Sequence, residues 1–359
     1  MPLHSDQEFF IQWHLTESCN LRCSHCYQTG SGQEELSFPE IEAVIGEIAD
    51  TLEEWSSAYG ISFSSSFTLT GGEPFLRRDF PAILEKIALR GFAVFLLSNG
   101  TLIDRKRAGM LASHGVKGVQ VSMEGPREVH EKIRGRGSFD AAVRGVRHLV
   151  GAGIPVTLNT TLSSLNADAF PEMMDLAVSL GVQKLGFSRL VPSGRGRDLL
   201  DRMLPAEEVK ELYTRIFASK PEKLALVTGD PVARQMRLTG EERNDDRKDG
   251  RSAGQDGREV PVGGCAAGLS GFTLLADGTV VPCRRLPVRL GTVRKDSLRE
   301  IWAASPVLAA LRDKTRYGGK CGACARWTHC RGCRAIAYAA SQAKGGGDFL
   351  AGDPQCFIE

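Results

Sequence analysis

The cysteines of this 359-residue chain fall into two separate groups. Three of the ten lie at positions 19, 23 and 26, seven lie between 265 and 356, and the stretch from 27 to 264 contains none. A chain that used cysteine only as a small core residue would distribute it more evenly. Disulfides are rare in a reducing cytosol, so cysteine groups of this kind indicate metal binding or redox chemistry.

The composition is that of an ordinary globular protein, with 42% hydrophobic and 25% charged residues. The formal net charge of +2 gives no reason to expect a nucleic-acid or membrane partner. No apolar run approaches the roughly 18 residues that a membrane-spanning helix needs. The first ten residues lack the basic-then-apolar layout of a signal sequence, so we expect a cytoplasmic protein.

Strand-like and helical segments alternate from about residue 9 to residue 219. Six strand–helix units of this kind imply an α/β fold with a parallel sheet, curled into a partial (β/α)6 TIM-like barrel. In such a fold the active residues lie at the carboxyl ends of the strands. The expected strands are 9–16, 67–70, 93–99, 119–123, 155–161 and 184–190, and the expected helices lie near 41–52, 79–91, 103–113, 139–151, 169–179 and 205–219.

The first cysteine group has the spacing C-x3-C-x2-C and follows the first expected strand. Thiolates of Cys19, Cys23 and Cys26 can hold three corners of a cubane iron–sulfur cluster and leave the fourth iron without a protein ligand. Inner-sphere chemistry needs such an open iron, so these cysteines are the catalytic candidates. A zinc site would need a fourth ligand, and His25 is too close to Cys26 to be a relaxed one.

A second motif, Gly71-Gly72-Glu73-Pro74, ends the second expected strand. Glycines at such a point let the backbone approach a ligand closely. With both motifs in these positions, the sequence resembles the radical S-adenosylmethionine (SAM) superfamily. The resemblance implies that the open iron of a 4Fe–4S cluster binds SAM and that the Gly-Gly-Glu-Pro turn contacts the SAM amino group. It also implies reductive cleavage of SAM to methionine and a 5'-deoxyadenosyl radical, which abstracts hydrogen from a substrate.

The same resemblance suggests further cofactor-binding residues on the later strands. Ser122 matches the segment in which a polar side chain reaches the SAM ribose, and Arg134 lies in a segment that follows the fourth strand in many relatives. A solvated position on the surface would explain Arg134 equally well. Hydrogen bonding in the core would explain the polar residues of the expected strand 155–161 equally well. The remaining candidates are Tyr27, Ser98, Asn99, Asn159 and Thr161.

The second cysteine group resembles the seven-cysteine SPASM module, which adds two auxiliary 4Fe–4S clusters to radical SAM barrels. One departure is the x2 spacing of Cys330 and Cys333, where many members have x3, so the geometry of that loop is left open. The inner cluster would have three cysteines, and therefore an open iron or a non-cysteine ligand; a structural zinc at the C-x2-C-x5-C-x2-C stretch is an alternative. By resemblance, the outer ligands are Cys321, Cys324, Cys330 and Cys356, and the inner ligands are Cys265, Cys283 and Cys333.

These features divide the chain into three parts. We expect the radical SAM barrel in residues 1–220, a bridging segment in 221–262 and a small cysteine-rich SPASM domain in 263–359. The bridging segment contains residues 240–258, which are dense in charge and glycine and predict a mobile linker.

The substrate is less strongly constrained. We favour a ribosomally synthesised peptide that receives a thioether or related crosslink, with a separate leader-recognition protein as an expected partner. Small-molecule chemistry on tetrapyrrole side chains is the alternative. Arginines 284, 285, 289 and 294 could meet substrate carboxylates or form a solvated basic edge.

Two further classes of protein fit the sequence less well. Anaerobic sulfatase maturases carry an aspartate base where this chain has Arg284, so that subfamily is disfavoured. A cluster-bearing electron carrier would need neither the Gly-Gly-Glu-Pro turn nor a barrel. As an enzyme, the protein would receive electrons from a flavodoxin- or ferredoxin-type donor.

Overall fold

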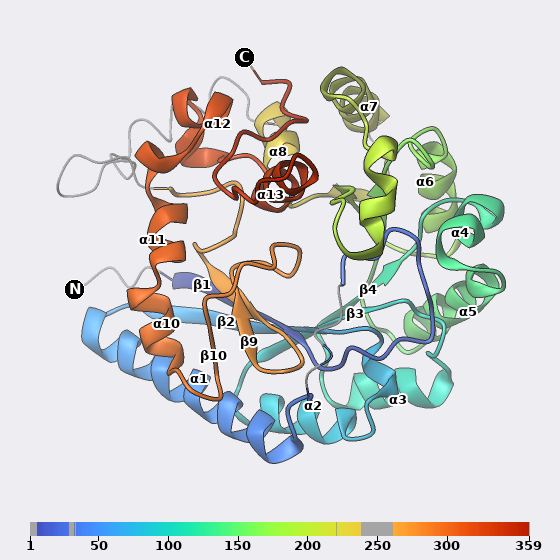
Figure 1. Ribbon diagram of the computed structural model, residues 1–359. Coiled ribbons are helices and arrows are strands. Elements are labelled where there is room, and N and C mark those ends of the chain that lie inside the picture. Colours follow the sequence, from blue (N-terminus) through green and yellow to red (C-terminus); the bar gives the residue numbers. More distant parts are fainter. Residues whose placement is uncertain (1–5, 29–31, 33, 220, 238–260, 359) are drawn as a thin grey trace.

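A curved sheet of parallel strands forms the centre of the molecule (Figure 1). The computed structural model describes residues 6–28, 32, 34–219, 221–237 and 261–358, so the charged segment 240–258 lies outside the described residues. Strands β1 to β7 lie in sequence order, and each pairs in parallel with the next. Their bounds are β1 Asp6–His14, β2 Ser62–Thr70, β3 Ala93–Ser98, β4 Gly118–Ser122, β5 Val156–Leu162, β6 Lys184–Arg189 and β7 Ala225–Val227.

Helices on the outside of the curved sheet connect successive strands, which confirms the expected partial barrel. The first of them begins at a capping box, where the backbone N–H and the hydroxyl of Ser37 each donate to Glu40 at 2.7 Å. The helices are α1 Phe38–Tyr59, α2 Phe80–Leu89, α3 Arg105–Ser113, α4 Arg127–Arg134, α5 Ser138–Gly151, α6 Phe170–Ser179 and α7 Ala206–Ser219.

Strand β2 begins five residues before the expected strand 67–70. Its first half, Ser62–Ser66, is rich in serine and therefore lacks the apolar signal of a buried strand. Backbone pairing decides this stretch instead, because every residue from Ser62 to Thr70 has a partner on β1. The pairing with β1 therefore determines this extension of the strand, and the side-chain pattern does not predict it.

Helix α4 was also absent from the expected elements. Its eight residues, Arg-Glu-Val-His-Glu-Lys-Ile-Arg, are mostly charged and contain too few apolar residues to show a helical period. Packing against the barrel nevertheless buries His130, Ile133 and Arg134. The helix therefore carries one predicted site residue into the interior.

The C-terminal part of the chain continues the same sheet on the other side of β1. Strand β8 Gly271–Leu274 pairs in parallel with β1, and β9 Thr279–Val281 and β10 Gly291–Thr292 follow it in antiparallel pairs. Beyond them lie helices α10 to α13, drawn in orange to red in Figure 1. Their bounds, with that of the preceding helix, are α8 Pro231–Arg237, α10 Leu298–Ala304, α11 Pro306–Arg312, α12 Gly319–Ala323 and α13 Arg334–Ala343.

Buried aliphatic and aromatic side chains fill the space between the sheet and the outer helices. Ile11, Trp13, Phe67 and Leu69 of β1 and β2 are completely shielded from solvent. Such burial fixes the strand positions, and with them the loops at the carboxyl ends of the strands. Among the described helices, none is both long and apolar enough to cross a membrane.

Candidate active site

The loop between β1 and α1 carries the first three cysteines, and the Gly-Gly-Glu-Pro turn holds it in place. The backbone N–H of Gly72 donates to the carbonyl of Thr16 at 2.7 Å, and that of Glu73 donates to the carbonyl of Ser18 at 2.8 Å. A Cβ atom at Gly72 would collide with the backbone of Ser18. The second glycine is therefore needed for the turn to approach the cysteine loop this closely.

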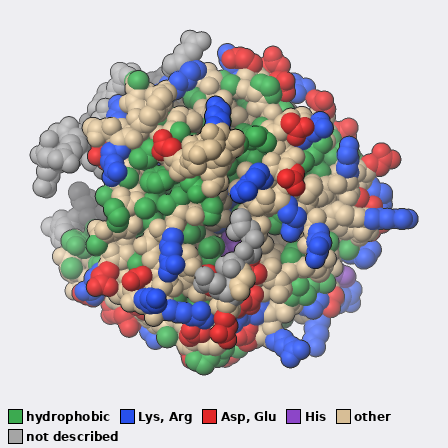
Figure 2. Space-filling model, in the orientation of Figure 1, with side chains coloured by type: hydrophobic (Ala, Val, Ile, Leu, Met, Phe, Trp, Pro, Cys, Tyr) green, Lys and Arg blue, Asp and Glu red, His purple; other side chains and the backbone are tan. Residues whose placement is uncertain are grey.

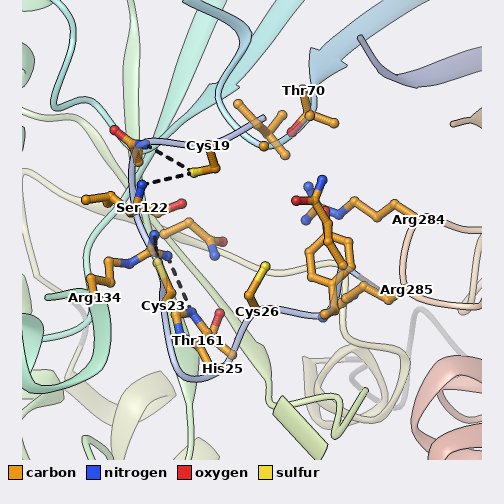
Figure 3. Close-up of a pocket in the computed structure, with 18 of the residues that line it drawn as sticks. Cys19, Cys23, His25, Cys26, Thr70, Ser122, Arg134, Thr161, Arg284 and Arg285 are labelled. Carbon is orange, nitrogen blue, oxygen red and sulfur yellow. Dashed lines mark hydrogen bonds between the residues drawn. The ribbon is translucent and has the colours of Figure 1, made fainter. Parts of the chain in front are cut away.

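Cys19, Cys23 and Cys26 line one cavity of about 140 Å³ at the carboxyl ends of the strands (Figure 3). The cavity brings together most of the residues that the sequence singled out. Two of them, Glu73 and Pro74, do not line it. The predicted residues on its wall are Tyr27, Gly71, Gly72, Ser98, Asn99, Ser122, Arg134, Asn159 and Thr161.

Glu73 is buried beside this cavity and joins β2 to β3. Its carboxylate accepts a hydrogen bond from the Ser98 hydroxyl at 3.0 Å and one from the backbone N–H of Asn99 at 2.9 Å. Burial raises the pKa of Glu73 to about 7, although these donors oppose the shift. Asn99 in turn donates to Asn20 at 2.9 Å, so Glu73 positions the cysteine loop from behind.

Arg134 and Glu124 form a buried pair next to Cys23. The Arg134 Nε donates to the Glu124 carboxylate at 2.9 Å, and Arg134 Nη1 lies 3.7 Å from the Cys23 Sγ. Burial alone raises the pKa of Glu124, but the charges of Arg134 and His25 lower it well below its usual range. His25 Nε2 is 3.2 Å from the same carboxylate, so the middle of the cysteine loop is tied to the end of β4.

Two members of this network, His25 and Glu124, are not among the site residues that the sequence predicts. The sequence suggests His25 only as a poor zinc ligand and gives no role for Glu124. One signal was available, since Glu124 is an acid between Met123 and Gly125 at the expected carboxyl end of a strand. Its partner in the fold, α4, was not expected from the sequence.

The three cysteines assigned to the inner cluster line a second cavity, of about 370 Å³. This cavity shares Gln120, Asn159 and Ser188 with the first cavity, so the two adjoin inside the barrel. Among its described lining residues there is one carboxylate, Asp230, and both of its oxygens accept hydrogen bonds from Arg189. The three cysteines are Cys265, Cys283 and Cys333.

The four cysteines assigned to the outer cluster line a third cavity, of about 430 Å³. The short Cys330–Cys333 loop is closed by two consecutive left-handed residues, Arg331 at φ 62° and Gly332 at φ 60°. Left-handed backbone is rare for a residue with a side chain, and here it accommodates the x2 spacing. The four cysteines are Cys321, Cys324, Cys330 and Cys356.

The three cavities fit iron–sulfur clusters better than single metal ions. Within the described residues, no three His, Cys, Asp or Glu side chains are arranged to hold one metal ion. A structural zinc needs four ligands on one ion, whereas a cubane places its thiolates on different irons. Three arginines that lie beside the auxiliary cysteines carry buried guanidinium atoms without a hydrogen-bond partner, and an anionic group at these sites would compensate their charge. These atoms are Nε of Arg285, Arg331 and Arg334 and Nη2 of Arg331.

The four arginines considered as carboxylate ligands or a basic edge divide into two pairs. Arg284 and Arg285 line both the first cavity and the second, and the Arg284 guanidinium lies 5.8 Å from the centre of the Tyr27 ring. Arg289 is exposed, and Arg294 forms a surface ion pair with Glu40 at 2.8 Å. Two of the four are therefore interior cations beside the predicted site of chemistry.

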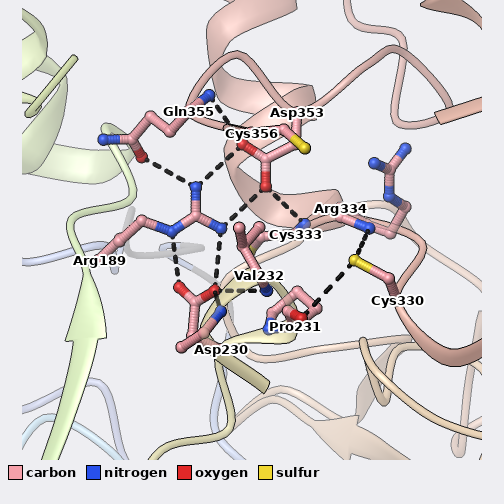
Figure 4. Close-up of polar contacts among 12 residues, drawn as sticks. Arg189, Asp230, Pro231, Val232, Cys330, Cys333, Arg334, Asp353, Gln355 and Cys356 are labelled. Atoms are coloured by element: carbon pink, nitrogen blue, oxygen red, sulfur yellow. Dashed lines mark hydrogen bonds and ion pairs between the residues drawn. The ribbon is translucent and has the colours of Figure 1, made fainter. Parts of the chain in front are cut away.

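A buried ion network joins the barrel to both groups of auxiliary cysteines (Figure 4). Arg189, at the end of β6, donates to Asp230 at 2.6 Å and to Asp353 at 2.8 Å. Asp353 also accepts the backbone N–H of Cys333 at 2.8 Å and lies three residues before Cys356. One guanidinium thus fixes the position of the C-terminal segment relative to the barrel.

Comparisons with known proteins agree with this architecture. A family model described as the radical SAM superfamily matches residues 13–177, and a model of the SPASM iron–sulfur cluster-binding domain matches residues 265–334. The chain is 34% identical over 351 residues to an AdoMet-dependent heme synthase of Methanosarcina barkeri, covering 96% of this chain and 95% of the relative. It is 29% identical over 339 residues to the mycofactocin maturase MftC of Mycolicibacterium smegmatis, covering 91% and 78%.

A solved structure shares the fold. SuiB of Streptococcus suis bound to S-adenosylmethionine superimposes with a TM-score of 0.71 at 14% identity, over 98% of this chain and 78% of that one. At this identity the likeness concerns the fold alone.

Proposed function

Because the chain belongs to the radical SAM superfamily and carries a SPASM domain, we propose that it directs a 5'-deoxyadenosyl radical to a carboxylate-bearing tetrapyrrole. The observation that carries this substrate class is the position of Arg284 and Arg285. Both line the cavity of the first three cysteines and the adjoining inner cavity. Guanidinium groups are the preferred partners of carboxylates, which tetrapyrrole side chains supply.

The relatives support the same substrate class. The matches include AdoMet-dependent heme synthases at 34% and 30% identity and a pre-heme d1 synthase at 29% identity over 97% of this chain. The sequence alone favours a peptide substrate, with tetrapyrrole chemistry as the alternative. The comparisons support that alternative better.

The residues of the chain have separable roles in this proposal. When bound at Cys19, Cys23 and Cys26, a 4Fe–4S cluster supplies the electron that cleaves SAM into methionine and the 5'-deoxyadenosyl radical. Gly71 and Gly72 would lie beside the SAM amino acid, and the polar residues Ser122 and Asn159 line the same cavity. In the proposed reaction this chemistry would abstract one hydrogen atom from a substrate carbon, with 5'-deoxyadenosine as the product. Arg284 and Arg285 orient that carbon by holding a nearby carboxylate.

Peptide maturation remains the second candidate. The observation in its favour is the likeness to the maturase MftC, at 29% identity over most of both chains. A peptide substrate would bring a leader-recognition protein as a partner. Either substrate would require an electron donor of the flavodoxin or ferredoxin type.

The experiment is anaerobic incubation of the reconstituted protein with SAM, a strong reductant and one of two probes. The first probe is Fe-coproporphyrin III, a tetrapyrrole with carboxylate side chains, and the second is a set of short cysteine-containing peptides. We expect the tetrapyrrole to increase formation of 5'-deoxyadenosine and to change in mass. A response to peptides alone would favour maturation. Absence of 5'-deoxyadenosine under every condition would refute radical SAM activity itself.

A further inference from the structure

Arg331 and Arg334 are buried cations without a carboxylate partner in the described part of the chain. Their exposed fractions are 1% and 0%. The other deeply buried arginines, Arg134 and Arg189, each form an ion pair with an acid. An isolated buried charge is strongly unfavourable, so the charges of Arg331 and Arg334 need an anion nearby.

Their hydrogen bonds leave donors unused. Arg331 Nη1 donates to two backbone carbonyls at 3.1 and 3.3 Å, but its Nε and Nη2 have no partner. Arg334 Nη1 donates to two backbone carbonyls at 2.7 and 3.2 Å, while its Nε has none. Neutral carbonyls satisfy individual N–H groups without balancing the charge.

Both residues lie beside the outer cysteines. Arg334 Nη2 lies 3.3 Å from the Cys321 Sγ, and Arg331 lines the cavity that the four outer cysteines share. Arg331 is also the one non-glycine residue with positive φ in the described part of the chain. A strained backbone of this kind persists where the surroundings require the side chain in one place.

The one carboxylate that acts on Arg334 is Asp353, and it is already the ion-pair partner of Arg189. From residue 314 to residue 347 the chain contains seven lysines and arginines and no aspartate or glutamate. A 4Fe–4S cluster held by four thiolates is itself an anion, and it gains a further negative charge on reduction. It would supply the missing counter-charge at this place.

We infer that Arg331 and Arg334 are the counter-cations of the outer auxiliary cluster and that they raise its reduction potential. Cations next to a cluster favour its more negative, reduced state, so their loss lowers the potential. Arg331 and Arg334 would act on the outer cluster alone, whichever substrate the enzyme uses.

The test is an EPR-monitored redox titration of the reconstituted full-length protein without SAM. The outer signal is assigned by subtraction, with a Cys19/Cys23/Cys26→Ala variant and a Cys265/Cys283/Cys333→Ala variant. We expect Arg334→Met to lower the midpoint potential of the outer cluster and Arg334→Lys to restore most of the shift. Arg316→Met, which removes an exposed cation from the same domain, should leave the potential unchanged.

Two results would overturn the inference. One is an unchanged midpoint potential in Arg334→Met at full iron content. The other is an Arg334→Lys potential as low as that of Arg334→Met, which would assign the effect to hydrogen-bond geometry. If Arg334→Met fails to retain the outer cluster, Arg331→Met takes its place, because Arg331 makes no hydrogen bond to a cysteine sulfur in the described structure. An unchanged potential there would equally refute the role.

Discussion

Arg134 Nη1 lies 3.7 Å from the Sγ of Cys23, a residue 111 positions earlier in the chain. The same guanidinium binds the buried carboxylate of Glu124. Replacement by methionine leaves Glu124 without its cation, and breaking such a buried pair costs about 3–5 kcal/mol. We expect Arg134→Met to lower the free energy of unfolding by that order and to reduce 5'-deoxyadenosine formation.

Denaturant unfolding and product quantification check this prediction, with Arg136→Met as the control. Arg136 is exposed two residues away, so its loss should change either quantity little. Equal unfolding free energies and equal 5'-deoxyadenosine formation in the two variants would contradict the role of the Arg134–Glu124 pair.

Glu73 gives the fold a defined pH dependence. Its pKa is about 7 in the folded protein against 4.5 ordinarily, so folding retains a proton that the unfolded chain releases. The contribution of Glu73 to stability therefore decreases as pH rises from about 4.5 to about 7 and is constant above that. We expect the stability difference between wild type and Glu73→Gln to change by about 2 kcal/mol between pH 5.5 and 8. A difference that does not vary with pH over this range would show that Glu73 is ionised throughout.

Iron content tests the assignment of the cysteines. Three cubanes predict about twelve irons per chain. We expect the Cys265/Cys283/Cys333→Ala variant to lose about four of them and still cleave SAM, because the first three cysteines lie in a different cavity. The matched variant Cys321/Cys324/Cys330/Cys356→Ala should also lose about four. Loss of all iron in either variant would contradict independent sites.

Arg284 and Arg285 should act on substrate binding. We expect Arg284→Gln and Arg285→Gln to raise KM for the tetrapyrrole probe by about tenfold or more, since a charge-assisted hydrogen bond contributes about 1.5–3 kcal/mol. SAM cleavage without substrate should change less. Arg289→Gln removes an exposed arginine of the same segment and should leave KM unchanged. Similar KM values in all three variants would argue against a carboxylate site.

Arg189 should stabilise the attachment of the C-terminal segment. Arg189→Met leaves Asp230 and Asp353 buried without their cation, and we expect a loss of about 3–5 kcal/mol in unfolding free energy. Arg202→Met, which removes a half-exposed surface pair with Asp201, should cost at most about 1 kcal/mol. Denaturant unfolding that gives the same loss of unfolding free energy for Arg189→Met and Arg202→Met would contradict this role.

Local patterns predicted much of the barrel. The apolar strands near 93–99, 119–123 and 184–190 have signals within a few residues, and each lies close to its expected place. The first half of strand β2 and the whole of helix α4 have no such local signal. Backbone pairing with β1 stabilises β2, and burial of a few side chains stabilises α4. Those interactions join residues far apart in the chain, and no local pattern records them.

The sequence alone determined the chemistry-bearing parts: the grouped cysteines, the Gly-Gly-Glu-Pro turn and the strand–helix alternation. Thiolate ligands and glycine turns are identified by residue type and short spacing, which the linear sequence contains. Only the tertiary structure decided that Glu73 supports the cysteine loop from behind, that Glu124 pairs with Arg134, and that two of four nearby arginines face the interior. Burial and charge compensation depend on which segments contact one another, and only the fold specifies contacts between segments that are far apart in the sequence.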